Sequence, residues 1–374
     1  MRITVNTAEF KNGMEKVFKV VAAKSYVPRM KNILLTADES GLYISASNLE
    51  QFAKMRIDAE TTAEGSFGFS DTKTLLKAMK FFAAHQTMLE YEPTERTEDG
   101  KVLRAGSVII RCGGKKARQT TFEPDEFPSF PELDADILNQ FEYSNKKLKE
   151  RLATVGYAAS TDDARPMILQ GIYFKRADMV ACDGFRLAVN TDESLQIENS
   201  FVTPPMAIKY VNEIMDEKLL FETDKKYIRI TDKQNGATVV SRLLDGEYMD
   251  YSQYTEYHGK EAVEIDTRSY ITALKYLDTF QKGKGVGVSW FDGNLGLKNS
   301  SGYFESEVNV RGIMPVEMCF NGRYMREALS QFGEEAKVYL EKETKPMILS
   351  DGANNNIAVV LPIRGEEKLF QKMA

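Results

Sequence analysis

Histidine and cysteine are scarce in this sequence. Its 374 residues include two histidines, His85 and His258, and three cysteines, Cys112, Cys182 and Cys319. The cysteines lie far apart, are odd in number and lack metal-ligand spacing, so we expect reduced thiols in a cytoplasmic protein. Two histidines give no basis for a histidine metal site or a catalytic triad. We therefore predict no metal and no cofactor.

Long apolar runs are also missing. No run approaches the roughly 20 residues that a membrane helix needs, and the opening Met-Arg-Ile-Thr-Val lacks the apolar region of a signal peptide. With 43% hydrophobic and 28% charged residues, the chain predicts a well-cored globular protein of two or three domains. Its net charge of −6 argues against a generally basic nucleic-acid binder but says nothing about how the charge is distributed.

Motifs for catalysis or nucleotide binding are lacking as well. Segment 282–287, Lys-Gly-Lys-Gly-Val-Gly, has the glycines of a phosphate loop, but a predicted strand follows where a helix is needed. Segment 113–116, Gly-Gly-Lys-Lys, is typical of a hairpin turn. No carboxylate pair recurs at a spacing that demands acid–base chemistry. We predict that the chain is not an enzyme.

One pattern occurs three times along the chain. An alternating strand precedes a helix whose apolar residues step by four and by three, as in Phe10, Met14 and Val17. The same pattern returns at 141–155 and 263–277, and a second strand–helix pair follows at 67–82, 201–214 and 318–332. Such self-similarity at about 120 residues indicates an internal repeat.

Three strand patterns follow each helix, one of them at 102–111, so each repeat has the order β-α-βββ-β-α-βββ. We predict an α+β fold of three tandem domains, each with two amphipathic helices packed on mostly antiparallel sheet. The domains are expected at 1–133, 134–257 and 258–374. Thr7, Ser144 and Asp266 are predicted to cap the first helix of each repeat.

The stretch 180–188, Val-Ala-Cys-Asp-Gly-Phe-Arg-Leu-Ala, predicts a strand, a tight turn at Asp183-Gly184 and a second strand. Alternation on the second strand would place Phe185 and Leu187 on one face and Arg186 on the other. An ordinary hairpin with a solvated arginine is the alternative to a functional role.

Positive charge concentrates on the predicted helices. Together these helices are net positive, although the whole chain is net negative. If they line one surface, they form a positive track suited to a polyanion. The alternative is that their lysines only cover solvated faces.

Four segments carry a resemblance that extends from Met1 to Arg364. They are Leu-Gln-Gly-Ile at 169–172, the stretch 180–188, Leu-Leu-Asp-Gly-Glu-Tyr-Met-Asp-Tyr at 243–251 and Val-Val-Leu-Pro-Ile-Arg at 359–364. Glu-Phe-Pro at 126–128 adds a fifth match. With the threefold repeat, they closely resemble the bacterial sliding clamp family, the beta subunit of DNA polymerase III.

The resemblance implies a head-to-tail homodimer, a six-domain ring that encircles duplex DNA, slides without sequence specificity and acts as a processivity factor. Basic helices would line the hole. DNA contacts are implied at Lys24 and, more weakly, at Lys73, Lys77, Lys80, Lys149 and Arg151. Heterologous contacts between domains one and three would close the ring, with Tyr276 and Leu277 as contributors.

The resemblance also implies a cleft between domains two and three for short linear motifs of polymerases, the clamp loader and repair proteins. Its residues would be Leu169, Cys182, Gly184, Phe185, Arg186, Leu187, Met249, Val359, Val360, Leu361, Pro362, Ile363 and Arg364. Leu169, Leu187, Val360 and Leu361 would form an apolar pocket for a partner's Leu or Phe. Arg186 and Arg364 would orient peptide oxygens.

The chain departs from the family pattern at several positions. Met249 stands where proline is usual, Cys182 where threonine is frequent, and segment 252–254 replaces a more basic run. A tail, 365–374, continues past Arg364, and its Lys-Leu-Phe at 368–370 loosely resembles the end of a clamp-binding peptide. We hypothesise that this tail occupies its own or a neighbouring cleft; a frayed terminus is the alternative.

Two rival functions remain. A non-ring scaffold that binds short linear peptide motifs would bind Leu-Phe peptides but would not be retained on circular DNA. An enzyme acting on nucleic acid would need a clustered acidic metal site, which the sequence does not contain.

Overall fold

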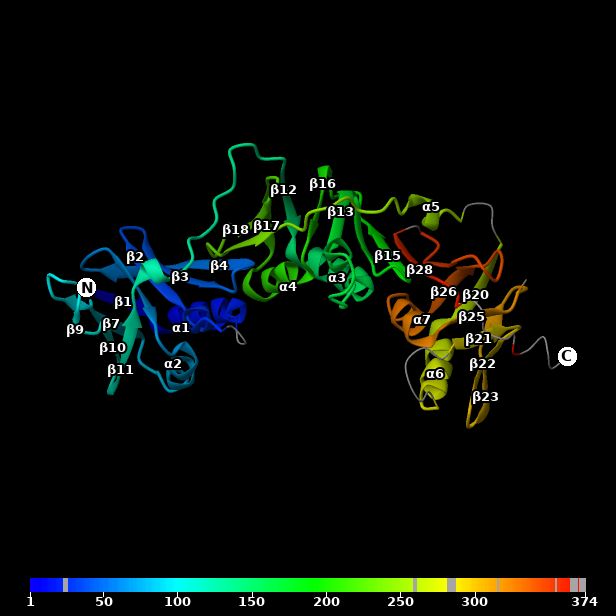
Figure 1. Cartoon of the computed structure of the whole chain (residues 1–374), viewed down its shortest axis with the longest axis horizontal. Coiled ribbons are helices and arrows are strands. Elements are labelled where there is room, and N and C mark those ends of the chain that lie inside the picture. Colours follow the sequence, from blue (N-terminus) through cyan, green and yellow to red (C-terminus); the bar gives the residue numbers. More distant parts are fainter. Residues whose placement is uncertain are drawn as a thin grey trace. The chain divides into compact units, whose positions relative to one another are not determined.

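The computed structural model describes residues 1–22, 26–257, 261–280, 287–314, 316–353, 355–363 and 369. Within these residues, the predicted order β-α-βββ-β-α-βββ is confirmed in all three repeats (Figure 1). No helix among them is both long and apolar enough to cross a membrane.

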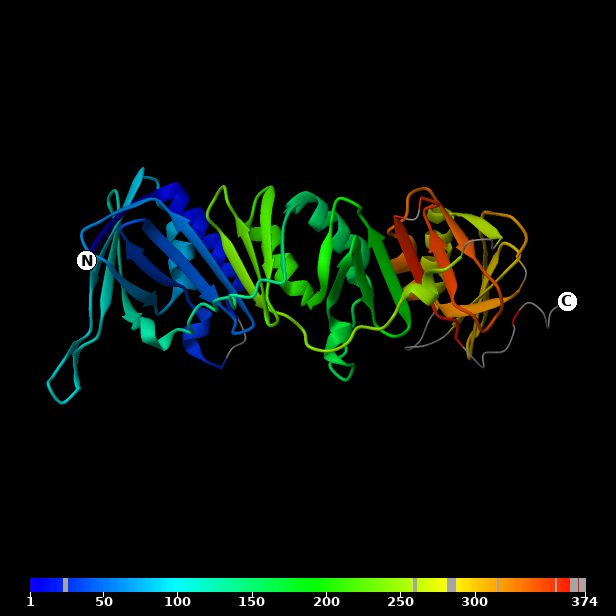
Figure 2. The ribbon, with the colours of Figure 1, turned by 90° about the horizontal axis from the view of Figure 1, so that it is seen from above.

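Repeat 1 consists of β1 (Arg2–Asn6), α1 (Thr7–Val17), β2 (Leu34–Asp38), β3 (Gly41–Ser47), β4 (Gln51–Ile57), β6 (Gly65–Phe69), α2 (Thr72–Met79), β7 (Gln86–Glu92), β10 (Ser107–Cys112) and β11 (Lys115–Phe122). It also has a short strand, β5 (Ala59–Thr61), and a two-stranded hairpin, β8 (Glu95–Arg96) and β9 (Val102–Arg104). This hairpin projects from repeat 1 in Figure 2, in cyan.

Repeat 2 consists of β12 (Asn139–Ser144), α3 (Asn145–Val155), β13 (Ile172–Arg176), β14 (Asp178–Cys182), β15 (Arg186–Thr191), β16 (Ile197–Thr203), α4 (Pro205–Ile214), β17 (Lys218–Thr223), β18 (Tyr227–Asp232) and β19 (Thr238–Arg242). A short helix, α5 (Ser252–Thr255), follows it.

Repeat 3 consists of β20 (Ala262–Asp266), α6 (Thr267–Asp278), β21 (Gly287–Phe291), β22 (Asn294–Asn299), β23 (Gly302–Glu307), β25 (Met318–Asn321), α7 (Gly322–Leu329), β26 (Glu335–Tyr339), β27 (Met347–Ser350) and β28 (Asn356–Val360). An extra short strand, β24 (Val310–Arg311), lies between its halves.

The apolar stripes of the helices bury as the periodicity predicts. Phe10, Met14 and Val17 of α1 are fully buried, and α1 packs against α2 and against strands β3 and β4. In repeat 3, α6 packs against α7 (Figure 1). Burying one face of each helix against another element supplies most of its stability, because short helices are marginal alone.

Two local predictions differ from the structure. Asn6, not Thr7, caps α1 by accepting the backbone N–H groups of Ala8 and Glu9. Thr7 is buried, and its hydroxyl lies 2.8 Å from that of Thr87. Segment 102–111 was expected to be one strand but is split into β9 and β10. Gly106 lies at the break, where an added Cβ would be 2.6 Å from the Thr121 hydroxyl oxygen.

The strands form two large sheets, and the strands of repeat 2 are divided between them. One has thirteen strands in the order β12-β17-β18-β19-β4-β3-β2-β6-β11-β10-β7-β1-β5. The other has nine, β16-β13-β14-β15-β28-β27-β26-β20-β24, and a separate sheet has the order β23-β22-β21-β25. Repeat 2 is thus joined to repeat 1 by the pair β19–β4 and to repeat 3 by the pair β15–β28.

The chain accordingly forms two compact units. The N-terminal unit holds residues 1–149 and 206–243, and the C-terminal unit holds residues 150–205 and 244–374. These units follow the sheets rather than the sequence repeats, because strand pairing joins halves of different repeats. The domain boundaries near residues 133 and 257 remain a prediction.

Candidate functional site

The candidate site lies in the C-terminal unit, where β15 pairs with β28. Leu187 is opposite both Cys182 of β14 and Val359 of β28, so these three side chains share one face of the sheet. Arg186 is opposite Val360, on the other face. The sheet therefore presents an apolar and a polar side at the same place.

The turn between β14 and β15 is built around Asp183. Its Oδ1 accepts the N–H groups of Phe185 and Arg186, at 2.9 and 3.0 Å. Gly184 has a φ of 89°, the left-handed region that favours glycine, and its N–H donates to the Cys182 sulfur at 3.2 Å. The predicted turn at Asp183-Gly184 is confirmed.

The apolar side is a cluster of buried residues with partly buried neighbours. Five predicted cleft residues meet in it: Cys182, Leu187 and Val359 are buried, and Leu169 and Met249 are partly buried at its margin. Burial raises the pKa of the Cys182 thiol, and the Gly184 N–H opposes this shift only in part. Cys182 is thus a small apolar side chain here and not a reactive thiolate.

Tyrosines that the sequence reasoning did not assign to the site support this cluster. Tyr173 stacks on Tyr248 with ring centroids 4.4 Å apart and meets Tyr251 edge-on. The Tyr251 hydroxyl donates to Asp178 at 2.5 Å. Burial raises the pKa of both Tyr248 and Tyr251, so both rings stay neutral. Tyr248 and Tyr251 belong to segment 243–251, one of the segments that carry the family resemblance, so the sequence did contain a signal for these two residues.

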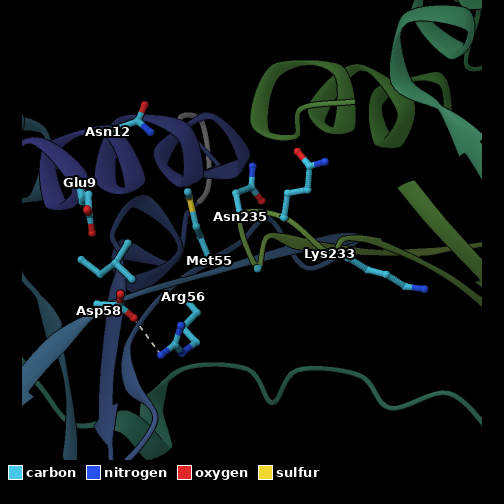
Figure 3. Close-up of a pocket in the computed structure, with 10 residues that line it drawn as sticks. Glu9, Asn12, Met55, Arg56, Asp58, Lys233 and Asn235 are labelled. Atoms are coloured by element: carbon cyan, nitrogen blue, oxygen red, sulfur yellow. Dashed lines mark ion pairs between the residues drawn. The ribbon is translucent and has the colours of Figure 1, made fainter. Parts of the chain in front are cut away.

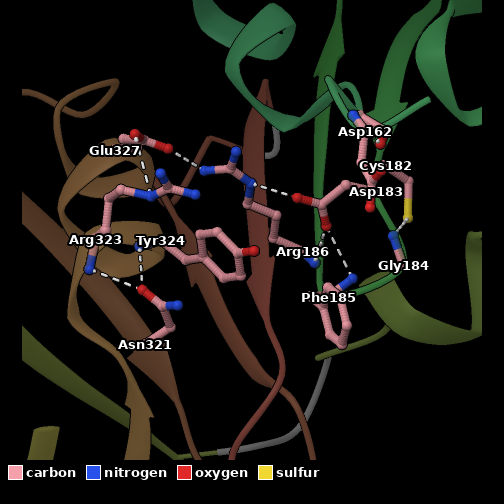
Figure 4. A network of polar contacts seen from close by, with 11 residues as sticks. Asp162, Cys182, Asp183, Gly184, Phe185, Arg186, Asn321, Arg323, Tyr324 and Glu327 are labelled. Carbon is pink, nitrogen blue, oxygen red and sulfur yellow. Dashed lines mark hydrogen bonds and ion pairs between the residues drawn. The ribbon is translucent and has the colours of Figure 1, made fainter. Parts of the chain in front are cut away.

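The polar side is a network around Arg186 (Figure 4). Arg186 is 8% exposed, and its guanidinium pairs with Asp183, at 3.0 Å, and with Glu327 of α7. It also lies over the rings of Tyr324 and Tyr157, 4.4 and 5.3 Å from their centroids. The alternative of a solvated arginine is wrong, because two carboxylates and two rings enclose the group.

Phe185 precedes β15 and does not share a face with Leu187, contrary to the prediction. Its ring is 46% exposed, lies 4.6 Å from the Arg165 guanidinium and stacks toward Tyr324 with centroids 6.4 Å apart. A polar hollow of about 780 Å³ opens beside it, lined in part by Arg165, Asp183 and Tyr324. Strand alternation failed here because the turn includes Phe185.

The predicted apolar pocket also needs correction at Val360. Its side chain lies in the core of repeat 3 with Trp290 and Phe320, not with Leu169 and Leu187. Alternation along β28 could have shown this, since Val359 and Val360 are neighbours and must face opposite ways.

The segment after β28 is hydrogen-bonded first to the turn between β14 and β15 and then to β25. The Leu361 N–H donates to the Phe185 carbonyl at 2.9 Å, Pro362 bridges to Phe320, and the Ile363 N–H donates to the Cys319 carbonyl at 2.8 Å. Leu361 is half-buried at the turn and lies outside both apolar clusters. Arg364 lies outside the described residues, as does the tail except Leu369, whose N–H donates to Glu317 at 2.5 Å. Glu317 is not among the predicted cleft residues.

The predicted DNA-contact residues divide into two groups. Lys73, Lys77, Lys80 and Lys149 are exposed. Arg151 is 5% exposed and donates to the Asn190 side chain and the Ala177 carbonyl at 2.8 and 2.7 Å, so its prediction as a DNA contact is wrong. Lys24 lies outside the described residues.

The two predicted dimer contacts also differ. Tyr276 is 45% exposed, whereas Leu277 is fully buried in the core of repeat 3. Adjacent helical residues point about 100° apart, so one faces solvent and the other the core. Leu277 cannot contact a second chain from there.

A second hollow, of about 450 Å³, lies in the N-terminal unit (Figure 3). It is lined by Glu9 and Asn12 of α1, by Arg56 and Asp58 and by the 233–236 turn, and Arg56 pairs with Asp58 at 2.9 Å. Its lining supplies no nucleophile–base pair. Within the described ranges, no three His, Cys, Asp or Glu side chains gather as metal ligands would.

Two family models match the chain. The model described as "DNA polymerase III beta subunit, N-terminal domain" matches residues 1–131, and "DNA polymerase III beta subunit, central domain" matches residues 142–250. The beta sliding clamp of Staphylococcus epidermidis is 23% identical, covering 97% of this chain and 99% of its own length. That of Staphylococcus aureus is 21% identical with the same coverage.

Solved structures agree in fold. A putative DNA polymerase III beta subunit from Eubacterium rectale has a TM-score of 0.84 at 19% identity, covering 97% of this chain and 100% of that one. The Thermotoga maritima beta subunit has a TM-score of 0.80 at 24% identity, covering 98% and 100%. A Bartonella birtlesii sliding clamp bound to griselimycin has a TM-score of 0.82 at 22% identity, covering 97% and 99%.

Proposed function

The chain belongs to the family of DNA polymerase III beta subunits, the sliding clamps that serve as non-catalytic processivity factors, and we propose that two copies close head to tail into a ring around duplex DNA. The ring slides without reading bases, because it is held by topology and needs only weak phosphate contacts. A peptide cleft on the C-terminal unit tethers the polymerase.

The periodicity of strand pairing carries this proposal. In each repeat, three strands follow the first helix. The third of these strands pairs with the last strand of the next repeat: β4 of repeat 1 pairs with β19 of repeat 2, and β15 of repeat 2 pairs with β28 of repeat 3, both antiparallel. The corresponding strands, β23 of repeat 3 and β11 of repeat 1, have no such pair within the described residues; β6 pairs with β11 only at Thr121 and Phe122, so segment 115–119 has one edge without a neighbouring strand. The same rule, applied once more between two chains, pairs β23 with the partner's β11 and closes a ring.

Charge on β11 and β23 supports the pairing. β11 exposes Lys115, Lys116 and Arg118, whereas β23 exposes Glu305 and Glu307. Opposite charges facing each other steer association and fix its register. Tyr276, on α6 beside β23, would contribute apolar contact at the same interface.

The DNA contacts are assigned to lysines on the helices. Lys73 and Lys77 of α2, Lys80 directly after it and Lys149 of α3 are exposed, as phosphate contacts must be. Each lysine at a phosphate releases counterions, so binding would weaken steeply with salt.

The apolar cluster around Leu187 and Val359 is assigned to partner peptides. Leu169 and Met249 are partly exposed at its margin, and the whole cluster is apolar apart from tyrosine hydroxyls and one thiol. A partner's Leu or Phe side chain would bury apolar surface there. The replicative polymerase, the clamp loader and other polymerases or repair proteins are the expected partners.

Small-angle X-ray scattering at several protein concentrations tests the ring. We expect twice the mass of one chain and the distance distribution of a flat, hollow particle. The ring should also be retained on nicked circular DNA and slide off after linearisation. A stable monomer at micromolar concentration, or a compact dimer, would contradict encirclement and favour the peptide-binding scaffold.

A further inference from the structure

Arg186 is the most heavily contacted charged group of the candidate site. Its Nε donates to Asp183 Oδ2 at 3.0 Å, and its Nη1 donates to Glu327 Oε2. Burial acts to lower the pKa of this guanidinium, but Glu327 and Asp183 outweigh it, so the pKa lies above its ordinary value. Arg186 is therefore a fixed cation at all ordinary pH.

Two aromatic rings contact the guanidinium as well. Its carbon lies 4.4 Å from the ring centroid of Tyr324 and 5.3 Å from that of Tyr157. Moreover, Arg186 is on the face of β15 opposite to Leu187 and Val359. A peptide in the apolar cluster would lie on the opposite face of the sheet from this arginine, whose side chain lines the polar hollow beside Phe185 instead.

What Arg186 does hold is the turn. Asp183, its ion-pair partner, accepts the N–H groups of Phe185 and Arg186, and the Phe185 carbonyl accepts the Leu361 N–H at 2.9 Å. A continuous chain of contacts thus runs from Glu327 on α7, through Arg186 and Asp183, to Phe185 and Leu361. It joins a helix of repeat 3 to a turn of repeat 2.

We infer that the Arg186–Glu327 pair is a lock that positions the 183–185 turn and Leu361, and that both residues act on peptide binding from a distance. This inference rests on the proposed peptide-binding function of the cleft. Arg186 is then a positioning residue, in place of the peptide-oxygen ligand that the family resemblance implied. Glu327, which no sequence motif singles out, becomes part of the binding machinery.

Glu327→Gln separates the lock from direct binding. If Arg186 bound peptide oxygens, Glu327→Gln would release it and leave affinity equal or tighter. If the pair positions the turn, Glu327→Gln lowers the affinity for a synthetic peptide that ends in Leu-Phe about tenfold, a loss within the usual range for contacting residues whose energies are coupled. Glu335→Gln is the matched control, since it makes the same substitution and removes an ion pair with Arg311, at 2.6 Å, without lining the hollow beside the turn. The control should bind within about twofold of the parent.

A second readout follows the turn itself. Phe185→Trp places a reporter on the turn, and the chain's one native tryptophan, Trp290, is fully buried and shielded from acrylamide. If the Arg186–Glu327 pair positions the turn, adding Glu327→Gln increases the quenching of Trp at 185, and adding Glu335→Gln does not. Unchanged quenching together with unchanged affinity would overturn the lock. If the parent protein binds no peptide, the proposed function of the cleft is wrong. The quenching experiment then tests by itself whether the Arg186–Glu327 pair positions the turn.

Discussion

At the scale of single residues, position 171 requires glycine because a side chain has no room there, and not because the backbone turns. An added Cβ would lie 2.2 Å from a Val202 methyl carbon and 2.8 Å from one of Leu244. Its φ is −101°, which any residue can adopt. The glycine of the Leu-Gln-Gly-Ile segment is thus required because β16 and Leu244 approach the backbone closely.

Gly171→Ala should therefore destabilise the C-terminal unit by about 1–3 kcal/mol, the usual cost of overpacking. Gly114→Ala is the control, because nothing lies within 4 Å of its added Cβ. Chemical denaturation of both variants measures the difference. Equal midpoints for the two variants would contradict the close-packing argument.

Arg151 and Lys149, two residues apart on α3, should respond differently to loss of charge. Arg151→Gln removes buried hydrogen bonds to Asn190 and Ala177 and should lower the free energy of unfolding by about 2–3 kcal/mol. Lys149→Gln should leave stability within about 0.5 kcal/mol and weaken DNA binding at low salt. Thermal melts and salt-dependent DNA retention distinguish the two; a stable Arg151→Gln with weakened DNA binding would restore the original prediction.

At the scale of elements, the β17–β18 turn is organised by a carboxylate. Asp224 is 2% exposed and accepts the N–H groups of Asp134, Lys226 and Tyr227, at 2.8, 2.6 and 2.6 Å. Burial acts to raise the pKa of this carboxyl, but the three N–H donors outweigh it, so the pKa lies below its ordinary value. The same carboxylate fixes the turn and the segment that precedes β12.

A lowered pKa gives a definite sign for pH dependence. The stabilisation by Asp224 is fully present above the unfolded-state pKa, near 3.8, and is lost as pH falls through the lower folded-state pKa. Asp224→Asn should thus be less stable than the parent at pH 7 by about 1–3 kcal/mol, with the gap closing toward pH 2. Denaturation curves at both pH values measure it; a gap independent of pH would show that the charge is irrelevant.

At the scale of the whole molecule, the proposed association uses the edge of β23 that faces no strand among the described residues and segment 115–119 of β11, since β6 pairs with β11 only at Thr121 and Phe122. Heterologous contacts make a ring only if the rotation closes, and open filaments if it does not. The two pairings within the chain, β4–β19 and β15–β28, are both antiparallel, so one geometry is repeated along the chain. Its repetition between chains is the reason to expect closure.

Charge reversal tests that association. Glu305→Lys with Glu307→Lys should weaken the dimer at least about tenfold, because like charges would then face each other. Adding Lys116→Glu with Arg118→Glu should restore much of the affinity. Sedimentation velocity at low salt measures both. Unchanged dissociation of the first variant would remove β23 from the interface.

The sequence by itself determined the repeat, the helices and most strands, because periods of 3.6 and 2 are local properties of the chain. Strand alternation could also have placed the Val360 side chain correctly, because Val360 follows Val359 on β28 and must face the opposite side of the sheet. What tertiary structure alone decided was the surroundings of charged side chains. Arg186 meets Glu327 across 141 positions, and Arg151 meets Asn190 across 39. No local pattern encodes such distant partners, and burial of a cation depends on them.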